Sequence, residues 1–328
     1  MFNPKIKISI QYVFFISAAS YLFFYLIHDA NWSTLTEGSF DVINRTPHWR
    51  VNQSRLMGPA ILKLMTTFGI ISEQWALRLF SFFFIAINNY FLAICISNLT
   101  NSKYQVLNTL IIFNSLFIIS QDVWLFAWDF IDITFFIFYG FVLFKDDYMK
   151  YLIPINFLHI FNRESALIMA VFFLVNLYIN NKNLRNNMKD KLFLGLVFNL
   201  FFGLIYTYFS RKILFIRQSD YTGGGQDLNN NFLGGNWVTP IYNYNSLFNG
   251  ETVANILIIA SLLLVFFILI KNFKKYNLIQ KKLALGIVVN ILPIFIFGIF
   301  TETRQYFPAI VLLTYLIFSN SVKSNLNN

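Results

Sequence analysis

Long apolar segments separated by short polar stretches run through the whole chain. A helix needs about 20 mainly apolar residues to cross the hydrocarbon core of a bilayer. Eleven segments reach or approach that length, at about 8–27, 57–71, 78–97, 105–120, 128–144, 151–161, 166–179, 192–213, 252–270, 284–300 and 307–319. The pattern predicts an all-α polytopic membrane protein that forms one transmembrane domain over residues 1–328.

The composition agrees with this interpretation. Of the 328 residues, 57% are hydrophobic and only 12% are charged, a balance typical of polytopic membrane proteins and far from that of soluble domains. The single cysteine, Cys95, falls in an apolar segment, so an intramolecular disulfide is excluded.

Basic loops predict the orientation of the chain. The first apolar segment follows Lys5 and Lys7 and has no small-residue cleavage site, which indicates a retained signal anchor with a cytoplasmic N-terminus. The stretch 180–191 carries four Lys or Arg and one acid, and the stretch 271–282 carries five and none. Because cytoplasmic loops are enriched in Lys and Arg, we expect both stretches to be cytoplasmic.

An odd number of segments fits this orientation only if one of them does not cross. The short stretch at 57–71 contains Lys63 and begins with Gly-Pro, so we expect a juxtamembrane helix on the outer face. About ten transmembrane helices remain, with both termini cytoplasmic and with long outer loops at 28–56 and 214–251. The Gly- and Asn-rich second loop is either a lid over a site or a mobile connection.

The predicted topology gathers acids on the outer side. The cytoplasmic side receives 15 of the 25 Lys and Arg but only 3 of the 15 Asp and Glu. This asymmetry argues for ordinary membrane topogenesis and against nucleic-acid binding. Several separate outer segments deliver charged residues to one membrane face, and these residues are Asp29, Arg55, Asp122, Asp129, Asp132, Arg163, Glu164, Glu302 and Arg304.

Each of these charges also has a plain structural interpretation. Asp29 could be a helix cap, and Arg163 with Glu164 could be a solvated pair at a turn. Glu302 and Arg304 are two residues apart, so on a helix their side chains should diverge and each should face another group. Arginines at the bilayer edge suit bidentate contact with phosphate, whereas nearby carboxylates suit a general base or metal coordination.

Known cofactor motifs do not appear in the sequence. No P-loop, dinucleotide fingerprint or metal-ligand spacing is present, and His28, His48 and His159 show no ligand pattern. The cofactor therefore stays unknown at this point, with a divalent cation as the open alternative.

At the level of pattern, residues 1–180 resemble the GT-C superfamily of membrane glycosyltransferases, in particular the branch of polyprenyl-phosphate-sugar enzymes and protein mannosyltransferases. The stretch "GPAILKLMTTFGIISEQWALRLFSFFFIAINNYFLAICISNL" is similar to the family's Pro-led juxtamembrane helix and following span. The stretch "LHIFNRESALIMAVFFLV" is similar to its paired short spans with a basic residue at the apex.

The resemblance implies a function and roles for the candidate residues. It implies transfer of a sugar from a polyprenyl-phosphate donor to a cell-envelope glycan or lipid, at the outer face of a bacterial cell membrane. Asp29 would be the catalytic base or the acid that orients the acceptor, and Asp129 a second acid. The residues that would bind the substrate or its phosphate are Arg55, Arg163, Glu164, Glu302 and Arg304, with Arg163 and Arg304 as phosphate ligands and Glu302 positioning Arg304 or the sugar. The family's usual acid pair is replaced by "HDANW", so Glu37 and Asp41 remain alternatives to Asp29. Members of this family differ in whether they use a divalent cation.

Two other functions remain open from the sequence. An envelope polysaccharide polymerase of the Wzy or EpsG kind would also place arginines at the outer face, but its donor would carry a pyrophosphate. A transporter or flippase would favour internal repeats and charges near the bilayer midplane, and no repeat is evident.

Overall fold

The computed structural model describes residues 9–41, 43–44, 54–121, 124–180, 186–210, 252–297 and 302–326. The candidate Asp122, the predicted outer loop at 214–251 and part of the loop at 28–56 lie outside the described residues.

The regular structure of the described residues is helical, and every one of the eleven predicted apolar segments contains a helix. The elements are α1 (Ile10–His28), η1 (Asp29–Asn31), α2 (Trp32–Phe40), α3 (Met57–Thr66), α4 (Glu73–Ser97), α5 (Lys103–Ile119), α6 (Ala127–Val142), η3 (Asp146–Tyr151), α7 (Leu152–Ile160), α8 (Ser165–Asn180), α9 (Asn186–Phe209), α11 (Thr252–Phe273), α12 (Leu278–Phe297), η6 (Thr303–Tyr306) and α13 (Phe307–Leu326). The all-α prediction is confirmed.

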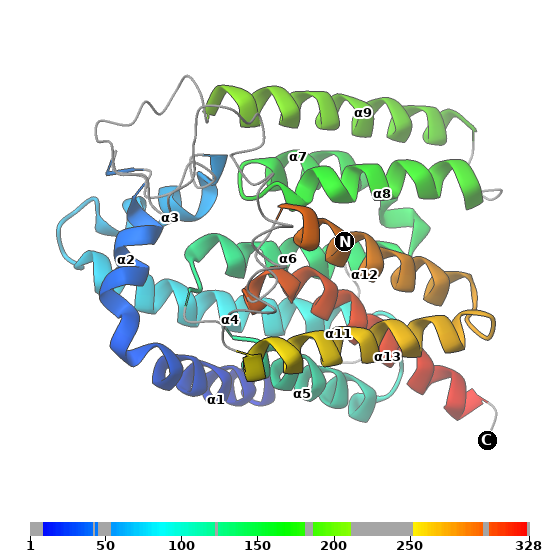
Figure 1. Ribbon diagram of the computed structural model, residues 1–328, viewed down its shortest axis with the longest axis horizontal. Helices are drawn as coiled ribbons and strands as arrows, with labels where there is room; N and C mark the ends of the chain where they lie inside the picture. Colours follow the sequence, from blue (N-terminus) through cyan, green and yellow to red (C-terminus); the bar gives the residue numbers. More distant parts are fainter. Residues whose placement is uncertain are drawn as a thin grey trace.

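The long helices lie side by side in a bundle, with the short α2 and α3 at one end (Figure 1). Helix α6 lies near the centre, where it packs against α4, α13 and α7. Helices α7, α8 and α9 form a layer on one side of α6, and α1, α4 and α5 lie on the other (Figure 1). The N-terminal ends of α6 and α8 therefore point toward the same end of the bundle.

Five helical stretches are long and apolar enough to cross a membrane, which supports the membrane assignment. They are Ile10–Phe40, Glu73–Ser97, Lys189–Phe209, Ile256–Phe273 and Leu278–Phe295, and two shorter apolar helices follow at Lys103–Ile119 and Ser165–Leu177. Helix α6 has 16 residues and α7 has nine, both short of the usual span. The count of ten crossings therefore stays a prediction.

Close helix packing at the centre depends on a glycine. A Cβ atom added at Gly140 of α6 would lie 2.4 Å from the ring of Tyr315 on α13. The Tyr315 hydroxyl donates a hydrogen bond of 2.9 Å to the carbonyl of Ile137. Because Gly140 has no side chain, α6 and α13 can approach closely. The Tyr315 hydroxyl then has a hydrogen-bond acceptor inside the apolar core.

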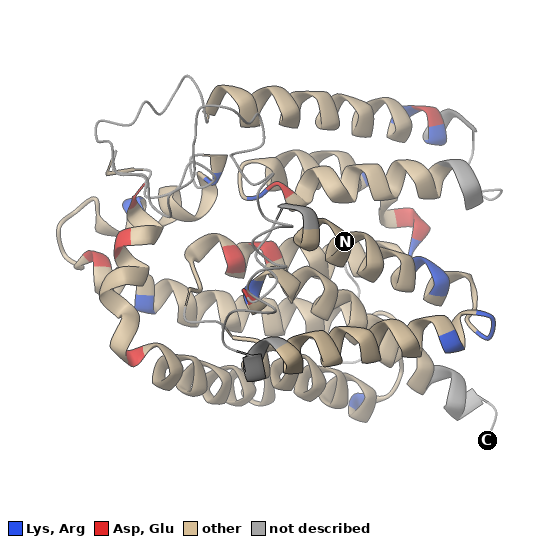
Figure 2. Ribbon diagram, viewed as in Figure 1, with Lys and Arg blue, Asp and Glu red and all other residues tan. Residues whose placement is uncertain are grey.

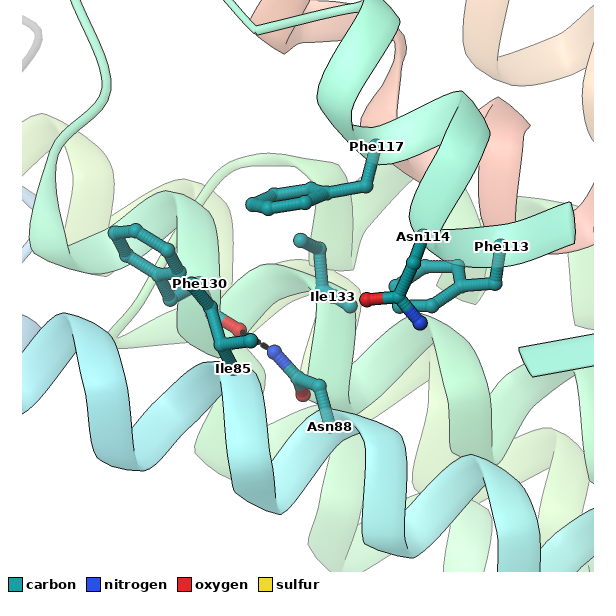
Figure 3. Close-up of a pocket in the computed structure, with 7 residues that line it drawn as sticks. All are labelled: Ile85, Asn88, Phe113, Asn114, Phe117, Phe130 and Ile133. Atoms are coloured by element: carbon teal, nitrogen blue, oxygen red, sulfur yellow. Dashed lines mark hydrogen bonds between the residues drawn. The ribbon is translucent and has the colours of Figure 1, made fainter. Parts of the chain in front are cut away.

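A small pocket of about 10 Å³ lies between α4, α5 and α6, lined mainly by apolar side chains (Figure 3). Its two amides are already engaged. Asn88 donates to the carbonyl of Phe130 at 2.9 Å, and Asn114 donates to Asn89 and to the carbonyl of Leu110, both at 2.7 Å. The pocket is therefore a gap in the packing rather than a polar binding site.

Candidate functional site

Four helix N-terminal ends meet at one place in the bundle and bring charged residues together. Arg55 precedes α3, Asp129 lies in the first turn of α6, Arg163 precedes α8, and Arg304 lies in η6 just before α13. Figure 2 shows acidic and basic residues close together around the start of α6. Helix N-termini carry a partial positive charge, so the meeting of several of them favours anions.

Asp129 is the centre of this charged cluster. Its side chain is fully buried, and its Oδ1 lies 2.8 Å from Arg163 Nη1. Its Oδ2 accepts a hydrogen bond of 2.9 Å from the backbone N–H of Phe126 and lies 3.5 Å from Arg304 Nη1. Asp129 therefore caps its own helix and holds two arginines from distant segments. Asp129 thus lies in the first turn of a helix, beside two cationic partners.

Glu302 and Arg304 do not diverge as the sequence predicted. Glu302 is the residue before η6, with a ψ of 87°, so its side chain turns back toward the helix. Its Oε2 accepts from Arg304 Nη2 at 3.0 Å and from Gln305 Nε2 at 2.8 Å. The expectation of divergence is wrong because it assumed that both residues are helical. The second half of the expectation holds, since Arg304 also faces Asp129 and stacks over Phe126 at 4.7 Å.

Arg163 and Glu164, unlike Glu302 and Arg304, are not each other's partner. Arg163 points to Asp129 and Asp132, whereas Glu164 accepts a hydrogen bond of 2.7 Å from the Ser54 hydroxyl and lies 3.5 Å from Arg55. The simple interpretation of a solvated pair at a turn is therefore wrong. Two adjacent residues of one turn instead connect to two different parts of the chain.

Arg55 has the least exposed side chain among the three arginines of the cluster. Its side chain is 10% exposed, and its guanidinium lies 5.3 Å from the centre of the Trp128 ring. Burial lowers the pKa of Arg55 to about 10, while the nearby Glu164 acts in the opposite direction. Arg55 therefore remains a cation at neutral pH, with Glu164 as its acidic partner.

A buried polar network continues from the cluster into the bundle. Asp132 Oδ2 lies 3.4 Å from Arg163, and its Oδ1 lies 2.5 Å from His159 Nε2 and accepts from Ser165 at 2.7 Å. The Tyr139 hydroxyl lies 3.0 Å from His159 Nδ1. The carboxylate favours a proton on Nε2, which leaves Nδ1 to accept from Tyr139.

This network is not a Ser-His-Asp catalytic triad. In such a triad the serine and the aspartate contact opposite nitrogens of the histidine. Here Ser165 and Asp132 both contact Nε2 of His159, at 3.2 Å and 2.5 Å. Asp132 is fully buried and contacts both His159 and Arg163, so it links the buried network to the charged cluster.

Local structure explains how the segments reach one another. In the turn between α7 and α8, the carbonyl of His159 accepts from the backbone N–H groups of Asn162 and Arg163. The Asn162 side chain then donates to the carbonyl of Trp128 at 2.9 Å, which ties the turn to the start of α6. The carbonyl of Phe161 accepts from the first residues of α3.

The carboxylates of the cluster differ in how far their side chains are exposed to solvent. Asp129 and Asp132 are fully buried and have both oxygens engaged, whereas Glu164 and Glu302 are 26% and 23% exposed. Both hydrogen bonds of Glu302 use Oε2, so within the described part of the chain its Oε1 accepts no hydrogen bond. The pKa of Glu302 is lowered, because Arg304 and Gln305 outweigh the effect of burial, which alone would raise it.

The alternative acids of the first outer segment lie elsewhere. Asp29 is exposed in η1, and Glu37 is exposed on α2, while Asp41 is buried at the end of α2. Among the described residues, no hydrogen bond or ion pair joins Asp29 to the cluster. The structure thus brings together Arg55, Asp129, Arg163, Glu164, Glu302 and Arg304 and leaves the first candidate base outside.

Sequence reasoning missed Ser54, His159 and Ser165. The last two flank Arg163 and Glu164 in "HIFNRES", and the density of polar residues in that short stretch was the available signal. In the ranges that the structure describes, no group of three or more His, Cys, Asp and Glu side chains is placed to hold a metal ion.

No protein-family model matches this chain, and no similar curated protein or solved structure was found. The function is therefore argued from the chemistry of the charged cluster.

Proposed function

We propose that this protein is a membrane glycosyltransferase whose active site is the charged cluster at the start of α6. In this proposal it transfers a sugar from a polyprenyl-phosphate donor to an envelope glycan or lipid, at the outer face of the membrane. The supporting observation is the convergence of Arg55, Arg163 and Arg304, each only 10–11% exposed, around helix N-terminal ends. Three arginines and several helix N-termini form a site suited to phosphate.

The arginines would hold the donor phosphate and stabilise it as it leaves. During transfer, the bond between the sugar carbon and the phosphate oxygen breaks, and the phosphate departs with the electron pair as an anion. Guanidinium groups that are already oriented by buried carboxylates stabilise this charge without reorganising. Asp129 and Asp132 are therefore positioning residues for Arg304 and Arg163 in this proposal.

Glu302 is the best-placed general base. Its Oε1 is accessible and accepts no hydrogen bond from a described residue, and its lowered pKa keeps it ionised at neutral pH. It would take the proton of the acceptor hydroxyl while the acceptor oxygen bonds to the sugar carbon. A phosphate that shares Arg304 would weaken the contact between Arg304 and Glu302 and so make the carboxylate more basic.

A transfer assay tests this proposal. The purified chain is placed in liposomes with a panel of polyprenyl-phosphate sugars and extracted envelope glycans and lipids, and product is measured for wild type, Arg304→Lys and Asp190→Asn. Arg304→Lys keeps the charge but loses bidentate geometry, and we expect transfer to fall by about 10²–10³-fold, as for loss of one oriented donor. Asp190 is exposed at the start of α9 and serves as the control.

Two further arms separate the alternatives. If Asp29→Asn is inactive and Glu302→Gln is fully active, the general base is Asp29 rather than Glu302. Activity only with pyrophosphate-linked oligosaccharides would indicate an envelope polysaccharide polymerase. Absence of transfer from both donor types would contradict the proposal and favour transport.

A further inference from the structure

A second basic site lies outside the charged cluster, where α1, α2 and α4 meet. The guanidinium carbon of Arg78 lies 5.5 Å from the ring centre of Tyr25, 5.1 Å from that of Trp32 and 5.0 Å from that of Trp75. Such contacts stabilise the cation, but the faces of aromatic rings carry only partial negative charge and do not neutralise it. No hydrogen bond or ion pair joins Arg78 to any residue in the described ranges.

Two buried N–H groups at this site have no acceptor. Arg78 Nε is buried without a hydrogen-bond partner in the described part of the chain, and so is Nε1 of Trp32, whose side chain is 1% exposed. Buried donors are usually paired, and leaving them unpaired is costly. Arg78 as a whole is only partly buried. Arg78 is therefore a cation without a carboxylate partner among the described residues, and an anionic acceptor can approach its exposed part from outside.

The aromatic rings select the geometry of that acceptor. They contact Arg78 within the range of cation–π interactions and so leave the planar edge of the guanidinium as its hydrogen-bonding side. A phosphate oxygen pair matches this edge in a bidentate way. The chemistry of the site therefore favours a phosphate group.

The surroundings indicate a lipid as the source of the phosphate. The segment leading into α4 exposes large apolar side chains: Leu64 is 70% exposed, Phe68 83%, Ile70 86% and Trp75 56%. Exposed apolar groups with a tryptophan beside a basic residue are typical of a segment at the membrane–water interface. We propose that Arg78, held among the rings of Tyr25, Trp32 and Trp75, binds the phosphate group of a membrane lipid. This site is independent of the proposed transfer reaction.

Lipid binding to the full-length protein in detergent tests the proposal by native mass spectrometry. The probes are phosphatidic acid, a diacylglycerol with the same acyl chains, and inorganic phosphate. The variants are Arg78→Gln, Arg78→Lys and Lys63→Gln, which removes a neighbouring exposed cation of α3 as a control. We expect Arg78→Gln to weaken phosphatidic acid binding roughly 10- to 100-fold, as for loss of a hydrogen bond to a charged group. Lys63→Gln should leave it nearly unchanged.

Each other outcome has a clear meaning. Equal phosphatidic acid binding by wild type and Arg78→Gln, or equal binding of the diacylglycerol, would overturn the proposal. If inorganic phosphate binds with the same dependence on Arg78 and displaces phosphatidic acid, the site binds free phosphate and the proposal of a lipid ligand is wrong. If Arg78→Gln does not fold, Arg78→Lys is the deciding variant, because it keeps the charge but loses the planar edge. Unchanged affinity of Arg78→Lys for phosphatidic acid would contradict the proposed site.

Discussion

At the scale of single residues, the cluster divides into buried groups that position and exposed groups that can react. Asp129 and Asp132 have no exposed side-chain surface, and each contacts an arginine. Glu302 keeps one accessible oxygen beside the same arginines. Burial therefore assigns different roles to carboxylates that look alike in the sequence.

For Glu302→Gln we expect transfer to fall by about 10²–10⁴-fold, because a general base is lost while the side chain keeps its shape. Donor binding should change little, so the loss should appear in kcat rather than in KM. The measurement is the transfer assay in liposomes, and the control is Glu73→Gln in the first turn of α4. A purely structural role for Glu302 would instead lower the thermal stability together with the activity.

The lowered pKa of Glu302 also predicts the dependence on pH. An acid whose pKa is lowered on folding stabilises the folded state at pH above its usual value of about 4.3, and this contribution disappears as pH falls through the lowered pKa. In wild type, the acidic loss of activity should therefore occur below the usual carboxyl range. Arg304→Gln removes the main cation beside Glu302 and should move this loss to higher pH. An unchanged profile in that variant would show that another group controls it.

Asp132→Asn tests the buried network. The substitution leaves Arg163 and His159 without their shared carboxylate, and breaking a buried ion pair costs about 3–5 kcal/mol. We expect a marked drop in Tm in detergent, measured by differential scanning fluorimetry. Asp147→Asn removes an exposed carboxylate of η3 and should leave Tm nearly unchanged. Equal stability of the two variants would contradict the importance of the network.

At the scale of elements, the site depends on how closely α3 approaches the start of α6. A Cβ atom at Gly58 would lie 3.0 Å from the Cβ of Ala127 and 3.0 Å from the backbone nitrogen of Trp128. Backbone atoms cannot move aside as the end of a side chain can. The glycine therefore allows the start of α3 to approach α6, so that Arg55, just before α3, lies against Trp128.

For Gly58→Val we expect a loss of about 1–3 kcal/mol of stability, the usual cost of overpacking. Arg55 should also move away from Trp128, which a change in tryptophan fluorescence would report. Ala60→Val adds a side chain of the same kind at an exposed position of α3 and is the matched control. A Gly58→Val protein as stable as this control would show that α3 can shift without cost.

At the scale of the whole molecule, charge is distributed unequally between the two ends of the bundle. Lys and Arg side chains gather where α11 meets α12 and where α9 begins, whereas the site lies toward the opposite end (Figure 2). From the positive-inside rule we predict that the basic end lies in the cytoplasm and the site outside.

Cysteine labelling tests this orientation. The only cysteine, Cys95, is fully buried, so single cysteines can be introduced without background labelling. An impermeant maleimide should label Thr67→Cys, after α3, on intact cells, and should label Lys274→Cys, between α11 and α12, only after lysis. The opposite pattern would place the site in the cytoplasm and exclude an outer-face reaction.

The sequence by itself determined the positions of the helices and the charges at their ends. Helix formation and burial in a membrane depend on runs of apolar residues, which are local properties of the chain. The approximate starts of α6, α8 and α13, and the presence of Asp129, Arg163 and Arg304 beside them, could thus be predicted. The joining of a first-loop residue, Arg55, to Glu164 could not.

Only the tertiary structure decided which charges meet. Arg304 reaches Asp129 across 175 residues, and Arg163 turns away from its neighbour Glu164. The backbone before η6 pairs Glu302 with Arg304, against the expectation from helical spacing. Asp29 is also an aspartate beside a helix end, yet it remains exposed outside the cluster. Such pairings depend on helix packing over long distances in the chain, and no local pattern of residues encodes them.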